Sequence, residues 1–217
     1  MVVAIDGPAG AGKSTVARRL ADALGFTYLD SGAMYRSVAL AAAERSQAPA
    51  EVAGALRLGV GDRVTIDGRD VTEAIRTPEV SEAASRVAAD PAVRAALVAE
   101  QRRLVSSGNW VVEGRDIGTV VAPGAAVKVF VTASEDERAR RRAAQTGAEV
   151  ATVLAEQSAR DERDRTRVHS PLEPAAGAVV LDTTDLDLDE VVARILALVR
   201  EADEGGAATP SRPAGGE

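Results

Sequence analysis

The chain has 217 residues, which suits a single domain with enough apolar residues for a sizeable core. Its 26 Lys and Arg against 33 Asp and Glu give a net charge of −7, which argues against general binding of nucleic acids. It has no cysteine, which excludes disulfides, thiolate metal sites and a cysteine nucleophile. The sequence opens on a predicted strand rather than a secretory signal, and no apolar run is long enough to span a membrane. We expect a cytoplasmic protein with neither a membrane nor a nucleic-acid partner.

The first predicted element is a strand over residues 2–5, a short run dominated by β-branched apolar residues. Residues 7–14 then match the pattern G-x-x-x-x-G-K-[ST] at every fixed position. Apolar residues follow at helical spacing as far as Gly25, where a helix would stop. This strand–loop–helix context predicts a phosphate-binding loop (P-loop) for a nucleoside triphosphate.

The chemistry of a P-loop assigns roles to individual residues. Glycines let the backbone wrap around phosphates with its N–H groups pointing inward. Lys13 places a positive charge on the β- and γ-phosphates, and the Ser14 hydroxyl can bind Mg²⁺. The residues expected to bind the triphosphate are Gly7, Pro8, Ala9, Gly10, Ala11, Gly12, Lys13, Ser14 and Thr15.

The next segments depart from simple strand–helix alternation. A second strand is predicted over residues 26–29, followed by a helix over about 33–44. Residues 46–62 give no clear assignment, whereas 63–71 predict a hairpin with a type I′ turn at Asp67 and Gly68. A hairpin after a strand–helix unit indicates a subdomain inserted into the parallel core.

Two more helices are predicted before the sheet resumes. The first begins at residues 77–80 and runs to about residue 88. The second, ending near 107–108, has Asp90 as its N-cap and Pro91 at its first position. Helical spacing places Val93 and Leu97 on the inward face of the second helix and Arg94 on another face.

Charged residues follow directly after the next predicted strand, residues 110–112. Glu113, Arg115 and Asp116 occupy the carboxyl end of this strand, where open α/β sheets bind their ligands. We expect Glu113 to serve a Mg²⁺ site, through a water molecule. A fourth strand is predicted over 127–131, with Lys128 indicating a position near a sheet edge.

Residues 160–167 are unusually rich in arginine. Positions 160, 163, 164 and 167 share one helical face, which carries three guanidinium groups and one carboxylate. A solvated helix with salt bridges is the commonest role of such a run. Beside a P-loop, however, phosphoryl transfer needs cations around the migrating group, which favours a functional face. The sequence leaves open which further arginines contact phosphates, the candidates being Arg138, Arg141, Arg142 and Arg163.

The last predicted elements are a strand over 178–181 and a helix over 187–199. Residues 201–217 are rich in Gly, Ala and Pro without periodicity, so we expect a disordered tail. Strands followed by helices, with a P-loop after the first strand, predict an α/β fold, a three-layer sandwich with a five-stranded parallel sheet.

Several functions are compatible with a P-loop. A GTPase-like switch should carry the motifs D-x-x-G, after a strand, and N-K-x-D, and we find neither motif. An ATPase motor should carry an apolar run that ends in Asp-Glu, and this run is also absent. Arginines spread over several segments favour a kinase, because a donor and an acceptor bring more phosphates than the P-loop can bind. A kinase for another small acceptor and a nucleotide-gated ATPase switch stay as alternatives.

Six blocks of the chain, in order, resemble bacterial cytidylate kinase. They are GPAGAGKST (7–15), LDSGAMYR (29–36), DVTEAIR (70–76), EVSEAAS (79–85), EGRDIGT (113–119) and RDERDRTR (160–167). The resemblance runs from residue 2 to about 200. The blocks at 70–76 and 114–119 distinguish that family from adenylate and other nucleoside-monophosphate (NMP) kinases.

The resemblance implies transfer of the γ-phosphate of ATP to CMP or dCMP, with Mg²⁺. We expect a monomer, although the sequence does not establish the oligomeric state. It implies three sets of acceptor-binding residues, which are Ser31, Arg36 and Arg115 for the phosphate, Ser85, Arg94 and Asp116 for the cytosine, and Arg160 and Asp164 for the sugar. Arg167 would clamp phosphates when a short lid closes. The residues expected to take part in catalysis are Lys13, Arg115, Arg160 and Arg167.

The same resemblance implies a division of the chain. Residues 1–200 form the kinase domain, whose core comprises 1–30, 108–145 and 170–200. An NMP-binding region with the hairpin insert is expected over about 31–107, and the lid over about 146–169.

Overall fold

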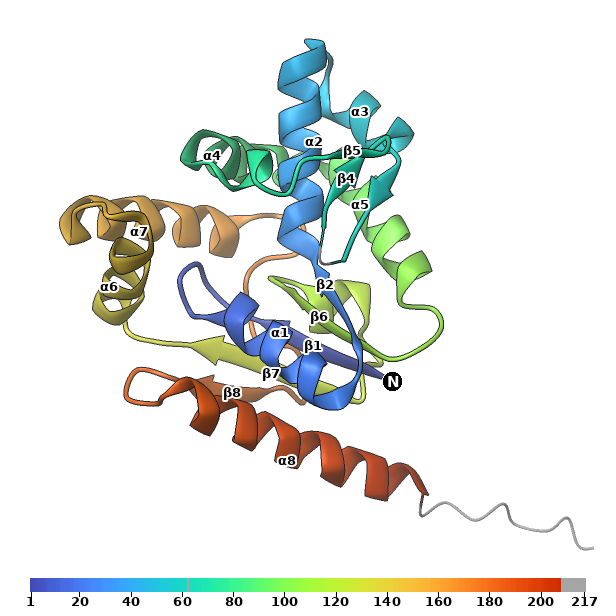
Figure 1. Ribbon diagram of the computed structural model, residues 1–217, viewed down its shortest axis with the longest axis vertical. Helices are drawn as coiled ribbons and strands as arrows, with labels where there is room; N and C mark the ends of the chain where they lie inside the picture. The colour runs from blue at the N-terminus through green and yellow to red at the C-terminus, as the bar shows by residue number, and fades with distance from the viewer. Residues whose placement is uncertain (62, 208–217) are drawn as a thin grey trace, which may run out of the picture.

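The computed structural model describes residues 1–61 and 63–207, with side chains described as far as Glu204. Its centre is a sheet of five parallel strands in the order β2-β6-β1-β7-β8 (Figure 1). The strands are β1 Val2–Asp6, β2 Thr27–Asp30, β6 Trp110–Gly114, β7 Val127–Thr132 and β8 Val179–Asp182. The predicted five-stranded parallel sheet is therefore confirmed.

Alternate residues of the central strand β1 face two separate hydrophobic clusters. Val3 and Ile5 pack in a cluster with helices α1 (Lys13–Leu24) and α8 (Leu188–Ala207). Ala4 packs on the other face, in a cluster with α2 (Ser31–Arg45) and α5 (Pro91–Leu104). Because strand side chains alternate between the two faces, a strand covered on both sides is apolar throughout. The result is the predicted three-layer sandwich.

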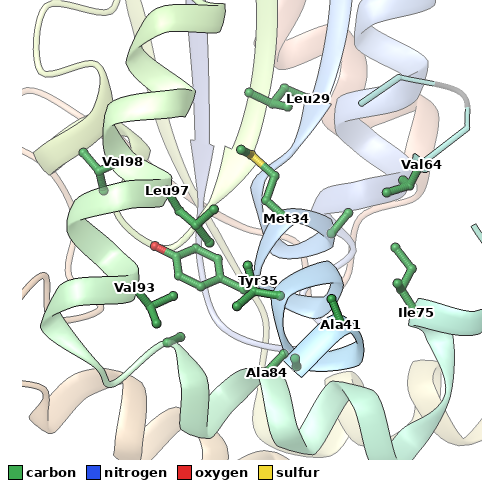
Figure 2. Close-up of a cluster of buried hydrophobic side chains, with 14 of the residues drawn as sticks. Leu29, Met34, Tyr35, Ala41, Val64, Ile75, Ala84, Val93, Leu97 and Val98 are labelled. Atoms are coloured by element: carbon green, nitrogen blue, oxygen red, sulfur yellow. The ribbon is translucent and has the colours of Figure 1, made fainter. Parts of the chain in front are cut away.

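The second cluster is built mainly from the long segment between β2 and β6. In Figure 2, Met34 and Tyr35 of α2 lie beside Leu97 of α5, with Ala84 of α4 (Pro78–Val87) close by. Helices α4 and α5 begin at the predicted caps, because Thr77 Oγ1 accepts from Val80 N at 3.3 Å and Asp90 Oδ1 accepts from Ala92 N at 2.8 Å. This segment stands on the sheet as a helical layer (Figure 1).

The predicted hairpin forms part of a small antiparallel sheet. Strands β4 (Thr65–Ile66) and β5 (Arg69–Asp70) flank Asp67 and Gly68, whose φ angles of 51° and 85° are those of a type I′ turn. Three elements here were not predicted, and they are α3 (Pro49–Ala55), β3 (Leu58–Gly59) and the 3₁₀ helix η1 (Ala74–Arg76).

Helices α6 (Glu135–Thr146) and α7 (Val150–Thr166) pack against each other beside the sheet (Figure 1). Ser134 is the N-cap of α6, as predicted. Helix α7 ends at Thr166, so Arg167 lies just beyond the helix rather than on its face. A five-residue π-helix, η2 (Ile117–Val121), follows β6 and had no signal in the sequence.

Strand β7 lies between β1 and the edge strand β8, and its pairing with β8 begins at Val129, so Lys128 lies one strand in from the sheet edge. Its side chain donates to the Ala176 carbonyl. The expectation for the end of the chain is wrong in part. Helix α8 continues to Ala207, so residues 201–207 are helical and not a disordered tail; the rest of that expected tail, 208–217, lies outside the described residues. Within the described ranges, no helix is long and apolar enough to cross a membrane.

Candidate active site

A cleft of about 1720 Å³ opens at the carboxyl ends of the central strands. The P-loop between β1 and α1 lines its floor, and α4 and α7 supply residues on its sides. Lys13, Arg94, Arg115 and Asp164 all line this single cleft although they lie far apart in the sequence. The P-loop and the arginine-rich helix therefore share one site.

The P-loop has the backbone shape that its glycines permit. A Cβ atom added to Gly7, whose φ is 149°, would lie 2.0 Å from the Val131 carbonyl oxygen, so β7 leaves no room for a side chain. Gly12, at φ 84°, is the N-cap of α1. Lys13 lies folded across the loop, where its Nζ donates to the Pro8 carbonyl at 2.6 Å. Burial, reinforced by the nearby Arg115 and Arg160 and opposed by Glu113, lowers the pKa of Lys13 to about 7.

Ser14 and Glu113 meet directly beside the loop. Ser14 Oγ donates to Glu113 Oε2 at 2.9 Å, and the Tyr28 hydroxyl donates to Glu113 Oε1. Burial, with Asp30 adding negative charge, raises the pKa of Glu113. Both side chains present oxygen, the donor atom that Mg²⁺ prefers. The part of the chain with described coordinates holds no group of three His, Cys, Asp or Glu that could bind a metal alone. The pair thus fits Mg²⁺ as a partial site completed by substrate phosphates and water.

Arg94 and Asp116 form a buried ion pair that lines the cleft. Arg94 Nη2 donates to Asp116 Oδ2, and Arg94 Nη1 donates to the Ala88 carbonyl at 3.2 Å. The sequence placed Arg94 on a face of α5 apart from Val93 and Leu97, and this second face is also buried, because the Arg94 side chain is only 6% exposed. Arg94 Nε and the neighbouring Ser85 Oγ are buried without a hydrogen-bond partner among the described residues. This corner offers a donor, an acceptor and an adaptable hydroxyl.

Asp164 lies at the centre of the arginine group. Arg115 Nε donates to its Oδ2 at 3.0 Å, and Arg167 Nη1 lies 3.7 Å from its Oδ1. Burial raises the pKa of Asp164, but Arg115, Arg167 and Arg160 together outweigh it, and the net pKa is below the usual value. Burial and the nearby Arg115 lower the pKa of Arg160 to about 10. Arg160 Nε and Arg167 Nη2 are also buried without a partner in the described part of the chain.

Two residues expected at the acceptor phosphate flank this group. Arg36 Nη2 lies 2.8 Å from Asp30 Oδ2, and Asp30 also caps α2. Ser31 Oγ donates to the Glu113 carbonyl at 2.7 Å, which ties α2 to the end of β6. Both Arg36 and Ser31 line the cleft.

The four arginines left open by the sequence differ in their surroundings. Arg138 is buried against Asp161 and the Ala9 carbonyl. Arg141 donates to Glu137 and to Thr183, and Arg163 pairs with Glu82 on α4. Arg142 lines the cleft together with Arg141 and Arg163, whereas Arg138 does not.

Sequence reasoning missed two buried carboxylates close to the site. Asp6 accepts from the backbone N–H groups of Ile117 at 2.9 Å and Gly118 at 2.7 Å. Its place at the carboxyl end of β1 was a usable signal, because Glu113 was singled out at the end of a strand for that reason. Asp161 accepts from Ala9 N at 3.0 Å. It lies on a different side of α7 from the predicted face, so helical spacing gave no signal for it.

The fold and the cleft together define a P-loop kinase. Solved structures of low sequence identity share this fold. A gluconokinase from Sinorhizobium meliloti aligns over 96% of this chain and 97% of its own, with a TM-score of 0.53 and 20% identity. An uncharacterized protein from Eubacterium ventriosum aligns over 92% and 98%, with a TM-score of 0.58 and 13% identity.

Sequence comparison narrows the class. The model of the family described as cytidylate kinase matches residues 3–201. The cytidylate kinase of Carboxydothermus hydrogenoformans is 49% identical over 92% of this chain and 97% of its own. The cytidylate kinase of Rhodococcus opacus is 47% identical over 93% and 95%. The chain belongs to the cytidylate kinase family, which confirms the resemblance seen in the sequence.

Proposed function

We propose that the protein transfers the γ-phosphate of ATP to CMP or dCMP, producing ADP and CDP or dCDP. The observation that carries this proposal is that the P-loop lysine and the buried Arg94–Asp116 pair line the same cleft. A donor and an acceptor nucleotide can therefore lie with their phosphates facing each other. Membership of the cytidylate kinase family supports CMP as the acceptor.

The donor phosphates lie in the P-loop, residues 7–15. Its backbone N–H groups and the N-terminus of α1 bind them, and Lys13 leaves the Pro8 carbonyl to contact the β- and γ-phosphates. Ser14 would hold Mg²⁺ directly and Glu113 would hold it through water, since the two side chains meet beside the loop. When bound, Mg²⁺ would neutralise phosphate charge.

The acceptor phosphate is held by Ser31, Arg36 and Arg115. One of its oxygens forms the new bond to the γ-phosphorus while the bond to the β,γ-bridging oxygen breaks, and ADP leaves with that oxygen. No general base is required, because the acceptor phosphate is already an anionic nucleophile. Positioning and charge neutralisation supply most of the catalysis.

The cytosine lies against Ser85, Arg94 and Asp116. The Asp116 carboxylate accepts from the N4 amino group, and the Arg94 guanidinium donates to N3 and O2. Ser85 Oγ and Arg94 Nε, which have no hydrogen-bond partner among the described residues, supply further polar contacts. Arg160 and Asp164 bind the sugar.

Residues 31–107 form the acceptor-binding region and 146–169 the lid. Closure of the lid, which carries α7, brings Arg160 and Arg167 to the phosphates and excludes water, which would otherwise take the γ-phosphate. The protein acts as a cytoplasmic monomer.

A coupled assay of ADP release tests this function. CMP and dCMP should be phosphorylated far faster than UMP, AMP or GMP. ADP release without any acceptor should be far slower than release with CMP, because closure needs the acceptor. Activity only with a non-nucleotide acceptor would indicate a different small-molecule kinase, and equal rates with and without CMP would indicate an ATPase.

A further inference from the structure

Both backbone polar groups of the P-loop residue Ala9 are bound by charged side chains from outside the loop. Ala9 N donates to Asp161 Oδ1 of α7 at 3.0 Å, and Arg138 Nη1 of α6 donates to the Ala9 carbonyl at 2.8 Å. Asp161 is 0% exposed and Arg138 is 3% exposed. Neither residue lines the cleft, so neither is placed to touch a substrate.

Asp161 and Arg138 also bind each other. Arg138 Nη1 donates to Asp161 Oδ2, and Arg138 Nε donates to the Ala133 carbonyl at 3.1 Å. Burying such a pair removes two charges from water, and apolar residues of similar volume often stabilise a fold equally well. The pair does something that apolar side chains cannot do, since it satisfies the N–H and the carbonyl of one loop residue simultaneously.

The next loop residue lies just as close to the same two helices. A Cβ atom added to Gly10 would lie 2.5 Å from Gln157 Nε2 and 3.0 Å from the Arg138 carbonyl oxygen. The path of the loop at Ala9 and Gly10 is therefore set by α6 and α7. The neighbouring position on α7, Arg160, and Asp164 one turn further on both line the cleft.

We propose that Asp161 is a positioning residue for the donor phosphates: with Arg138 it holds Ala9 so that the P-loop keeps the shape that binds them. The inference rests on the proposed function and adds a residue to it. Through Asp161, the helix that carries Arg160 and Asp164 also sets the geometry of the loop that binds ATP. The binding of the acceptor base at Arg94 and Asp116 does not depend on this contact.

The nearly isosteric variant Asp161→Asn tests the proposal. Its amide group cannot accept from both Ala9 N and Arg138, because one of its two atoms is a donor. We measure ADP binding and CMP binding separately by calorimetry. Losing a hydrogen bond to a charged group predicts a Kd for ADP raised about 10- to 100-fold. The Kd for CMP should stay within about twofold in the same variant, because its contacts are untouched.

Glu162→Gln is the matched control, since Glu162 is the exposed neighbour on α7 and the charge change is the same. It should bind both nucleotides like the wild type. If Asp161→Asn proves too unstable, Asp161→Glu keeps the charge beside Arg138 and should still weaken ADP binding selectively. Unchanged ADP binding, or equal weakening for ADP and CMP, overturns the proposal.

Hydrogen exchange of the nucleotide-free protein gives a readout that does not depend on the reaction. In Asp161→Asn, amides of residues 9–11 should exchange faster, while those of β1 and β6 keep their protection. Faster exchange throughout the protein would mean a general loss of stability and would count against a positioning role. If the wild-type protein bound ADP but not CMP, the proposed acceptor would be wrong while this test of Asp161 would still stand.

Discussion

Arg163 of α7 and Glu82 of α4 form an ion pair between the two sides of the cleft, with 3.0 Å between Arg163 Nη2 and Glu82 Oε2. Their side chains are 39% and 49% exposed. The hydrogen bond from Arg163 is the main cause that lowers the pKa of Glu82. The pair therefore joins the proposed lid to the proposed acceptor-binding region in this conformation.

We predict that Arg163→Gln affects substrate binding more than stability. An exposed ion pair contributes about 0.2–1 kcal/mol, so the free energy of unfolding should change by less than about 1 kcal/mol. If the pair forms as the cleft closes, its loss should raise the KM of both substrates about two- to fivefold at low salt. Urea unfolding and steady-state kinetics measure the two effects.

Arg165→Gln is the matched control on the same helix, because Arg165 is exposed and its ion-pair partner among the described residues is Glu135 of α6, at 3.9 Å. It carries the same charge change and should leave KM unaltered. Equal KM values for the wild type and Arg163→Gln at low salt would show that the ion pair does not contribute to closure.

Lys13→Ala should leave a folded protein with kcat reduced about a hundredfold or more, the scale of losing one charge contact in a transition state. The chain offers a control in Lys128→Ala, since Lys128 lies on β7 and its side chain hydrogen-bonds to the Ala176 carbonyl, away from the P-loop lysine. That variant should keep its activity. The coupled assay measures kcat of both variants, and circular dichroism verifies that they are folded. A folded Lys13→Ala protein with kcat within a few-fold of wild type would remove Lys13 from catalysis.

The features that could be predicted are those formed by neighbouring residues. The P-loop needs a strand, a glycine-rich turn and a helix in succession, and residues 2–24 supply them in that order. The type I′ turn depends on two adjacent residues, Asp67 and Gly68, that tolerate positive φ. Such local structure is determined within a few residues, so the sequence is sufficient to identify it.

The features that could not be predicted join distant segments. Helical spacing predicts which residues share a face with Arg94. It cannot predict that Asp116, 22 residues later, pairs with Arg94 and so makes the burial of the Arg94 side chain possible. Asp161 and Ala9 are 152 residues apart. The end of α8 was predicted too early from the Gly- and Glu-rich composition of the residues after 200. Ala202 packs against the core cluster, and this tertiary packing outweighs the local composition.

The pKa of the buried Asp6 side chain predicts that the stability of the protein depends on pH. Burial, with Asp116 nearby, raises its pKa from 3.8 to about 6, although Gly118 and Ile117 N–H groups and Lys13 oppose the shift. The folded protein then binds the proton more tightly than the unfolded chain, so stability is greatest below pH 4 for this group and falls as the pH rises to about 6. A shift of about two units corresponds to roughly 3 kcal/mol.

Urea unfolding from pH 4 to 7 tests this dependence in the wild type and in Asp6→Asn, which does not titrate. The free energy of unfolding of the wild type, relative to the variant, should fall between pH 4 and 6 and then level off. A constant difference over the whole range would mean that Asp6 has an ordinary pKa in the folded protein.

The last prediction concerns the choice of base. Uracil has an acceptor where cytosine has its N4 amino group, and a proton on N3 where cytosine has an acceptor. Asp116→Asn removes the charge that accepts from N4 and adds a donor that can meet uracil's O4. We predict that it lowers kcat/KM for CMP by about two to three orders of magnitude, roughly 3–4 kcal/mol, for a lost charged hydrogen bond and an unmatched group. The value for UMP should fall much less.

The ion pair with Arg94 makes a second role for Asp116 possible, in which it merely holds Arg94 in place. In that case CMP and UMP would lose activity equally. Asp164→Asn is the matched control, because Asp164 is also a buried carboxylate paired with arginines but is assigned to the sugar, which CMP and UMP share. Asp164→Asn should lower kcat/KM for both nucleotides by the same factor. If Asp116→Asn also left the CMP/UMP ratio unchanged, Asp116 would be a support for Arg94 and not a reader of the base.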